Sequence, residues 1–203
     1  MDFGKALEFP FKDSDWIMKM IWLSVFMLLT PVLIGIPFLT GYMVLTIRGV
    51  IKGNETLPEW SGNWSEIFAE GIKYCIVVLV IIIVGGIVGV VGIGLFTFAW
   101  NIIATILGVL TMARFAATGD LNDLLDFNWY INFTKNNWQN MLFVIIFSMV
   151  GGFVAGFGLI AFLIGIFFTM YVYAMMYAHL VGQMYVAGNA VVSKPASVLA
   201  EGA

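Results

Sequence analysis

Charged residues are scarce in this chain, and their scarcity argues against a water-soluble globule. Asp, Glu, Lys and Arg make up 10% of the 203 residues, whereas hydrophobic residues make up 62%. A soluble domain carries about 25% charged residues, because its whole surface must be wetted. The apolar side chains must therefore face lipid, and we expect an integral membrane protein whose first partner is the lipid bilayer.

Cysteine, histidine and basic runs are also nearly missing, and each gap excludes a class of function. Cys75 is the only cysteine, which makes an intramolecular disulfide or a cysteine metal cluster impossible. A net charge of −3 without any basic run argues against a nucleic-acid partner. The sequence lacks a Ser–His–Asp constellation, an HExxH motif and a phosphate-binding loop. We therefore expect no enzyme activity, no metal site and no cofactor.

Three long stretches without a charged residue make up most of the sequence. They lie between Lys19 and Arg48, between Lys73 and Arg114, and between Lys135 and Lys194. A membrane-spanning helix needs about 20 apolar residues, so the second and third stretches can each hold two. The first stretch is shorter and contains Pro31 and Pro37. It predicts either two short or tilted helices or a single kinked one.

Turn-forming residues lie near the centre of each stretch, which predicts three helical hairpins. They are the Pro and Gly residues within 31–37, 85–94 and 151–158. With this folding, all 9 Lys and Arg residues lie on one side of the membrane. Basic residues concentrate on the cytoplasmic side. We therefore expect a multi-pass protein of the cell membrane (inner or plasma membrane) with six spans and both termini in the cytoplasm.

A recurring helix ending divides the chain into three units. A polar residue is followed, after four other residues, by glycine and then Asn or Asp. The pattern occurs at Arg48–Asn54, Arg114–Asp120 and Gln183–Asn189. Glycine often ends a helix in the left-handed conformation. We predict parallel units of about 1–53, 54–119 and 120–189 in a single transmembrane domain, 1–189, with 190–203 as a C-terminal tail.

Each unit also begins with an amphipathic segment. The apolar faces consist of Phe3, Leu7 and Phe11, then Trp64, Ile67, Phe68 and Ile72, and then Leu121, Leu124, Leu125 and Trp129. Helical spacing with acidic residues on the opposite face is typical of a helix that lies in the membrane interface. The predicted fold class is an all-α integral membrane protein of three parallel repeats, each an interfacial helix followed by a transmembrane hairpin.

Arg48 and Arg114 are the first candidate binding residues, since they occupy equivalent helix ends. Together they could form a positive mouth for an anionic solute or a lipid headgroup. The simpler interpretation is that they anchor and cap the helices on the cytoplasmic side.

His179, Gln183 and Asn101 are the other candidates, because polar residues inside apolar stretches are costly and often functional. His179 could bind a haem or chlorophyll metal or relay a proton, but no second histidine exists to complete a bis-histidine site. Gln183 lies on the same helical face as His179. Hydrogen bonds between helices explain His179 and Gln183, and also Asn101 with Thr97 and Thr105.

Several short motifs resemble a known family. They are Gly41-Tyr42, Arg48, Gly53, Leu57-Pro58-Glu59-Trp60, the segment Arg114–Gly119 and the segment Ala178–Gln183. In these motifs the chain resembles, up to about Asn189, the membrane-protein family known as domain of unknown function 4013. The resemblance implies a polytopic prokaryotic membrane protein, and it supplies no activity or site residues.

Two functions fit these observations. The first is a non-catalytic structural or accessory component that associates with other membrane protein subunits. It suits the small soluble mass and the glycine-rich faces Gly85–Gly89 and Gly152–Gly156. The second is a transporter or channel for a small anionic solute or lipid. A cavity lined by Asn101 and His179 would favour transport.

Overall fold

The computed structural model describes residues 1–91, 94–160 and 164–192, and every regular element in these ranges is helical. The predicted all-α class is confirmed. In chain order the α-helices and short 3₁₀ helices are α1 (Phe3–Glu8), η1 (Phe9–Phe11), α2 (Trp16–Leu28), η2 (Thr30–Val32), α3 (Gly35–Ile51), α4 (Trp64–Val91), α5 (Gly94–Thr118), η3 (Asn122–Leu125), α6 (Phe127–Gly156), η4 (Phe157–Ile160) and α7 (Ile164–Val192).

Four of these helices are long and apolar enough to cross a membrane, which indicates a membrane protein. Their apolar parts contain 27, 23, 30 and 26 residues in α4, α5, α6 and α7. At 1.5 Å per residue each is about 35 Å long or more, which exceeds the ~30 Å hydrocarbon core and favours tilted helices. The apolar helices α2 and α3 have 13 and 17 residues, too few for a straight crossing.

The first uncharged stretch contains two helices rather than one kinked helix. η2 and a left-handed residue, Leu33 (φ 63°), separate α2 from α3. Gly35 then begins α3 so close to α2 that a Cβ atom there would lie 1.9 Å from the carbonyl oxygen of Phe26. A side chain at this position would force the turn open.

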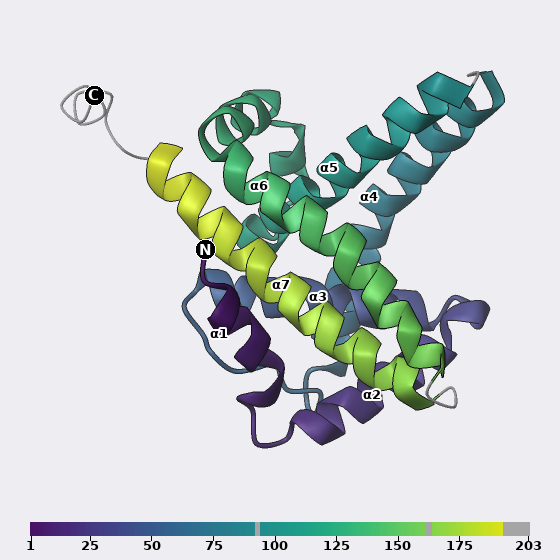
Figure 1. The fold of residues 1–203 in the computed structure, drawn as a ribbon, viewed down its shortest axis with the longest axis vertical. Coiled ribbons are helices and arrows are strands. Elements are labelled where there is room, and N and C mark those ends of the chain that lie inside the picture. Colours follow the sequence, from purple (N-terminus) through teal and green to yellow (C-terminus); the bar gives the residue numbers. More distant parts are fainter. Residues whose placement is uncertain (92–93, 161–163, 193–203) are drawn as a thin grey trace.

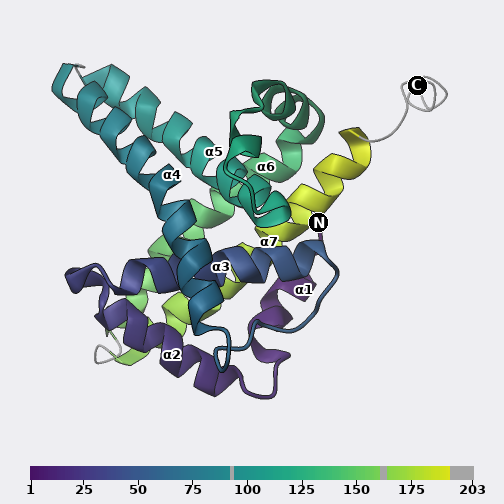
Figure 2. The same ribbon diagram turned by 180° about the vertical axis from the view of Figure 1, so that it is seen from behind.

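The three helix pairs diverge toward one side of the molecule. The turn ends of α2 and α3, of α4 and α5, and of α6 and α7 all point right in Figure 1 and left in Figure 2. The N-terminus and the far end of α7 lie toward the other side in both views. The α4–α5 pair extends furthest from the rest of the chain.

Two of the three predicted glycine helix endings are present. Gly53 follows α3 with φ 83°, and Gly119 follows α5 with φ 72°, both in the left-handed region. The third prediction is wrong, because α7 continues through Gly188 to Val192. Gly188 instead allows close packing, since a Cβ atom there would lie 2.3 Å from Cε2 of Phe133.

The predicted interfacial segments take three different forms. α1 and η1 form a separate short helical segment before α2. The second segment is not separate, because Trp64–Ile72 form the first turns of α4, with no helix-breaking residue to divide them from the span. The third comprises η3 and the first turns of α6, which Figure 1 shows end-on.

A kink at Asn137 sets the first turns of α6 apart from the rest of the helix. Asn137 has non-helical backbone angles (φ −135°, ψ 19°) inside α6. Its side-chain amide donates to the carbonyl oxygen of Met184 on α7 at 2.9 Å, and its side-chain oxygen accepts from Asn140. The kink therefore coincides with a buried polar contact between α6 and α7.

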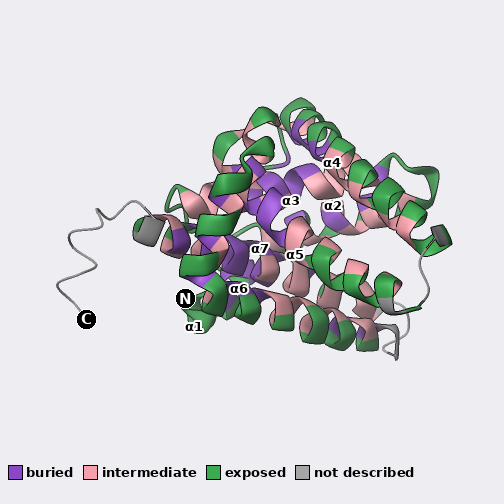
Figure 3. Ribbon diagram, turned by 90° about the horizontal axis from the view of Figure 1, so that it is seen from above, coloured by how far each residue is buried: buried purple, intermediate pink, exposed green. Residues whose placement is uncertain are grey.

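The closest helix contact joins α3 to α4 and uses two glycines. A Cβ atom on Gly41 would lie 1.8 Å from the carbonyl oxygen of Ile67, and one on Gly71 would lie 1.7 Å from that of Pro37. Buried residues concentrate on α3 and α7, whereas the outer parts of α4 and α5 are exposed (Figure 3). The core lies where the three helix pairs converge.

Candidate functional site

His179 and Gln183 lie together on α7 at a polar cavity of about 280 Å³. Nδ1 of His179 lies 2.9 Å from Nε2 of Gln183, and the His179 ring packs 4.6 Å from that of Phe9. The His179 side chain is buried, with the residue 8% exposed. The cavity is lined by Asp2, Lys5, Val50, Gly53, Asn54, Glu55, His179 and Gln183.

Gln183 holds the N-terminal segment against α7. Its amide nitrogen donates to the backbone oxygen of Asp2 at 2.9 Å, and its amide oxygen accepts from the backbone N–H of Asp2 at 2.5 Å. Tyr171, three turns earlier on α7, donates its hydroxyl to the carbonyl oxygen of Pro10 at 2.8 Å. These contacts give His179 and Gln183 a clear structural role: they dock α1 and η1.

His179 does not belong to a group of metal-ligating side chains among the described residues. Within residues 1–91, 94–160 and 164–192, no group of three or more His, Cys, Asp and Glu side chains is placed to hold a metal ion. The cavity beside His179 contains two carboxylates, Asp2 and Glu55, together with Lys5. It has the composition of a small polar pocket.

Arg48 bonds to two other helices through its Nε and Nη2 atoms. Its Nη2 forms an ion pair with Glu70 of α4, and its Nε donates to the carbonyl oxygen of Ala116 on α5 at 2.9 Å. Lys73 pairs with the same carboxylate at 2.7 Å. Arg48 therefore ties the carboxyl ends of α3 and α5 to α4. A polar cavity of about 250 Å³ also borders Arg48, with Lys52 and Asn54 in its wall.

Arg114 has a different set of partners from Arg48, and it is not among the residues that line the cavity beside Arg48. Its Nη1 lies 3.5 Å from the hydroxyl of Tyr185, and its Nη2 lies 4.0 Å from a carboxylate oxygen of Asp126. The guanidinium carbon lies 4.7 Å from the centre of the Trp129 ring. The Nε of Arg114 and the hydroxyl of Tyr130 are buried, and the structure shows no hydrogen-bond partner for either.

Asn101 lies apart from the other candidates, on the exposed α4–α5 pair. Its amide donates to the carbonyl oxygen of Thr97 at 2.8 Å, and its own carbonyl oxygen accepts from the hydroxyl of Thr105 at 2.8 Å. All three residues belong to α5. Asn101 and His179 do not line a common cavity among those described here.

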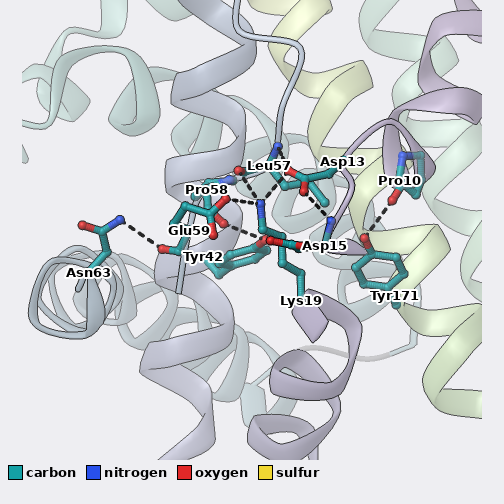
Figure 4. Close-up of polar contacts among 10 residues, drawn as sticks. All are labelled: Pro10, Asp13, Asp15, Lys19, Tyr42, Leu57, Pro58, Glu59, Asn63 and Tyr171. Atoms are coloured by element: carbon teal, nitrogen blue, oxygen red, sulfur yellow. Dashed lines mark hydrogen bonds and ion pairs between the residues drawn. The ribbon is translucent and has the colours of Figure 1, made fainter. Parts of the chain in front are cut away.

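A buried charged cluster around Lys19 was not predicted. Lys19 is 2% exposed, and its Nζ contacts Asp13 at 2.5 Å, Glu59 at 2.6 Å and the carbonyl oxygen of Leu57 at 3.0 Å (Figure 4). Asp13 also accepts from the backbone N–H groups of Asp15 and Leu57. The cluster fixes the 52–63 segment to the start of α2.

Burial and hydrogen bonding act in opposite directions on Asp13. Burial opposes ionisation of the carboxyl, but hydrogen bonds from Lys19 and from the N–H groups of Asp15 and Leu57 outweigh it. Together they hold the pKa of Asp13 below its ordinary value of 3.8. The carboxylate is therefore charged at neutral pH and forms a true ion pair with Lys19.

An aromatic stack continues the cluster into the core. Trp60 stacks on Tyr42 at 4.4 Å between ring centres and on Phe26 at 5.2 Å. The Tyr42 hydroxyl donates to the carbonyl oxygen of Pro58 at 3.1 Å (Figure 4). The motif Leu57-Pro58-Glu59-Trp60 thus supplies one ligand of Lys19 from its first residue, another from Glu59, and the stacked ring from its last.

The comparisons with known proteins give a family and no activity. A family described as "Protein of unknown function (DUF4013)" matches residues 24–166. The match includes Leu57–Trp60 and Arg114–Gly119 but ends before Ala178–Gln183. No curated protein and no solved structure matches the chain. Because the match spans well over half of the 203 residues, the chain belongs to this DUF4013 family of unknown function.

Proposed function

We propose that the protein is a non-catalytic component of a larger assembly in a prokaryotic cell membrane, and that the α4–α5 pair associates with other membrane protein subunits. The observation that carries the proposal is the exposure of this pair. The buried share of the apolar window is 11% in α4 and 22% in α5, compared with 17% in α6 and 39% in α7. Val90, near the end of α4, is 89% exposed.

The outer face of α4 suits close helix packing. Gly85 faces inward, since a Cβ atom there would lie 2.6 Å from Nε1 of Trp100, but Gly86 and Gly89 have no other atoms within 4 Å of that position. Lipid tails are as apolar as the side chains, so helices in a bilayer associate through small residues that let backbones approach. Gly86 and Gly89, three positions apart, offer such a face.

The proposed arrangement in the membrane follows the charges and the three diverging pairs. Six helices, α2 to α7, would enter the bilayer as three parallel units, with the turns on the outer side and both termini in the cytoplasm. Arg48 and Arg114, at the opposite ends of their helices from the turns, would then lie on the cytoplasmic side. The short α2 and α3 would be accommodated by local thinning of the bilayer or by contact with α4 and α7.

Purification in a mild detergent from the native membrane, followed by mass spectrometry, tests the proposed function. We expect a second membrane polypeptide to co-purify in fixed stoichiometry. Changing both Gly86 and Gly89 to leucine should remove it while the chain itself stays folded, because neither position contacts the rest of the protein. Gly156→Leu is the matched control, since Gly156 also has open space around it but lies on α6. A chain that purifies alone, as monomer or homo-oligomer, would contradict the proposal.

A further inference from the structure

The two arginines at equivalent helix ends differ in how completely they are bonded. Arg48 has a carboxylate in direct contact and a carbonyl oxygen at 2.9 Å. Arg114 has a hydroxyl at 3.5 Å and a carboxylate at 4.0 Å, and its buried Nε has no partner. Hydrogen bonds from a guanidinium to oxygen are normally about 2.7–2.9 Å long. Arg114 is therefore held in position without a close anion.

A second unpartnered donor lies beside it. Tyr130 of α6 has a buried hydroxyl without a hydrogen-bond partner. Its ring lies 5.1 Å from that of Trp129, and the Arg114 guanidinium packs 4.7 Å from the same Trp129 ring. A buried donor left unsatisfied costs free energy, and such groups in native proteins usually mark a ligand or a functional role. The side chains that carry two such groups, Arg114 on α5 and Tyr130 on α6, both pack against the Trp129 ring.

The surrounding residues orient the guanidinium and leave it reachable. The Trp129 ring lies against the guanidinium group of Arg114 and is itself fixed by a bond from its Nε1 to Asn189 at 3.3 Å. The Arg114 side chain as a whole is 17% exposed although its Nε is buried, so a ligand would approach from that exposed side. Asp126 is 48% exposed, and one of its oxygens already caps α6 by accepting from the backbone N–H of Trp129. An incoming anion would compete with a weak, distant carboxylate.

We propose that Arg114, with Tyr130 and Tyr185, binds a phosphate group at the carboxyl end of α5. The guanidinium offers parallel N–H donors that match two phosphate oxygens, and a phenol from another direction suits the third oxygen of a tetrahedral group. A planar carboxylate would satisfy the guanidinium alone. A phospholipid headgroup and free phosphate share this chemistry. Arg48, already paired with Glu70, does not take part.

Binding to the purified full-length protein in detergent tests the site, with short-chain phosphatidic acid and inorganic phosphate as separate probes. Arg114→Gln and Tyr130→Phe are each expected to weaken binding by about 10-fold or more, since each removes a hydrogen bond to a charged group. Lys52→Gln removes an exposed cation at the end of α3 and is the matched control, which should bind like the wild type. Asp126→Asn keeps an oxygen to cap α6 but removes the competing charge, so it should strengthen binding; a purely structural arginine would show no such gain.

The probes also identify the source of the phosphate group. If both probes bind and Arg114→Gln loses the binding, the site is supported. If only phosphatidic acid binds, with the same loss of binding in Arg114→Gln, the site is assigned to a lipid headgroup. Binding of inorganic phosphate alone, with the same loss, assigns it to a soluble ligand. Binding of neither probe, or binding that Arg114→Gln and Tyr130→Phe leave unchanged, would overturn the proposal. Tyr130→Phe removes one buried, unpartnered oxygen and keeps the shape of the ring, so its result does not depend on whether Arg114→Gln folds.

Discussion

Gly71→Ala is expected to break the contact between α3 and α4 and to cause a large loss of stability. The new Cβ atom would lie 1.7 Å from the carbonyl oxygen of Pro37 and 2.9 Å from the backbone nitrogen of Gly41. Both are backbone atoms of a helix, so no side-chain rotation relieves the clash and α3 must move away. Overpacking commonly costs about 1–3 kcal/mol, and we expect at least ~3 kcal/mol here.

Equilibrium unfolding in mixed detergent micelles measures this effect, and Gly86→Ala is the matched control. Gly86 lies on the same helix, α4, with nothing within 4 Å of the added atom. Alanine is a better helix former than glycine by about 1 kcal/mol, so this control should be neutral or slightly stabilising. An ordinary surface substitution changes the free energy of unfolding by no more than ~0.5 kcal/mol. If Gly71→Ala also stays within that range of the wild type, the close α3–α4 packing is not present in the micelle-bound protein.

Lys19→Met is expected to be the second most damaging change, because it leaves Asp13 buried without its counterion. The two side chains are 3% and 8% exposed. Removing one partner of a buried ion pair costs about 3–5 kcal/mol, whereas replacing both with uncharged groups is often nearly neutral. The double variant Lys19→Met, Asp13→Asn should therefore recover much of the loss. Unfolding free energies of Lys19→Met, of Asp13→Asn and of the double variant in the same micelles measure this coupling.

Lys12→Met provides the control, because Lys12 forms an exposed pair with Glu55 at 2.6 Å. The side chains are 33% and 63% exposed, and exposed pairs contribute about 0–1 kcal/mol. If Lys19→Met lowers the free energy of unfolding no more than Lys12→Met does, the charged cluster of Figure 4 does not stabilise the fold.

The same cluster predicts how stability changes with pH. The folded pKa of Asp13 lies below 3.8, so its ionised form is favoured in the folded state. Its contribution is fully present above the unfolded pKa and is lost as the pH falls through the folded pKa, below about 4. Unfolding free energies measured between neutral and acidic pH should decline less steeply in Asp13→Asn than in the wild type.

The sequence predicted features that depend on local chemistry. The membrane character follows from composition, and the endings at Gly53 and Gly119 follow from the need for a left-handed residue after a helix. The break of the first stretch near Pro31 follows from the lack of a proline N–H. Gly188 shows the limit of this reasoning, because the same glycine pattern there serves packing against Phe133 and not a helix end.

The candidate site depended on contacts that the sequence does not reveal. Lys19 and Glu59 are 40 residues apart, and a lysine at the edge of an apolar stretch is usually an anchor that reaches toward water. The two arginines had the same sequence context, and only the fold distinguishes the paired Arg48 from the incompletely bonded Arg114. The Leu57–Trp60 motif was identified by resemblance, while its physical role lies in binding Lys19 and stacking on Tyr42.

The side of the membrane that each segment faces is the most direct test of the proposed arrangement. In a Cys75→Ser background, Leu33→Cys places a thiol in the turn between α2 and α3, where the residue is 70% exposed, and Thr56→Cys places one at an exposed residue of the 52–63 segment. Intact cells would be treated with a membrane-impermeant maleimide. Leu33→Cys should be labelled in intact cells, and Thr56→Cys only after permeabilisation. Labelling of Thr56→Cys in intact cells would contradict cytoplasmic termini and three outward hairpins.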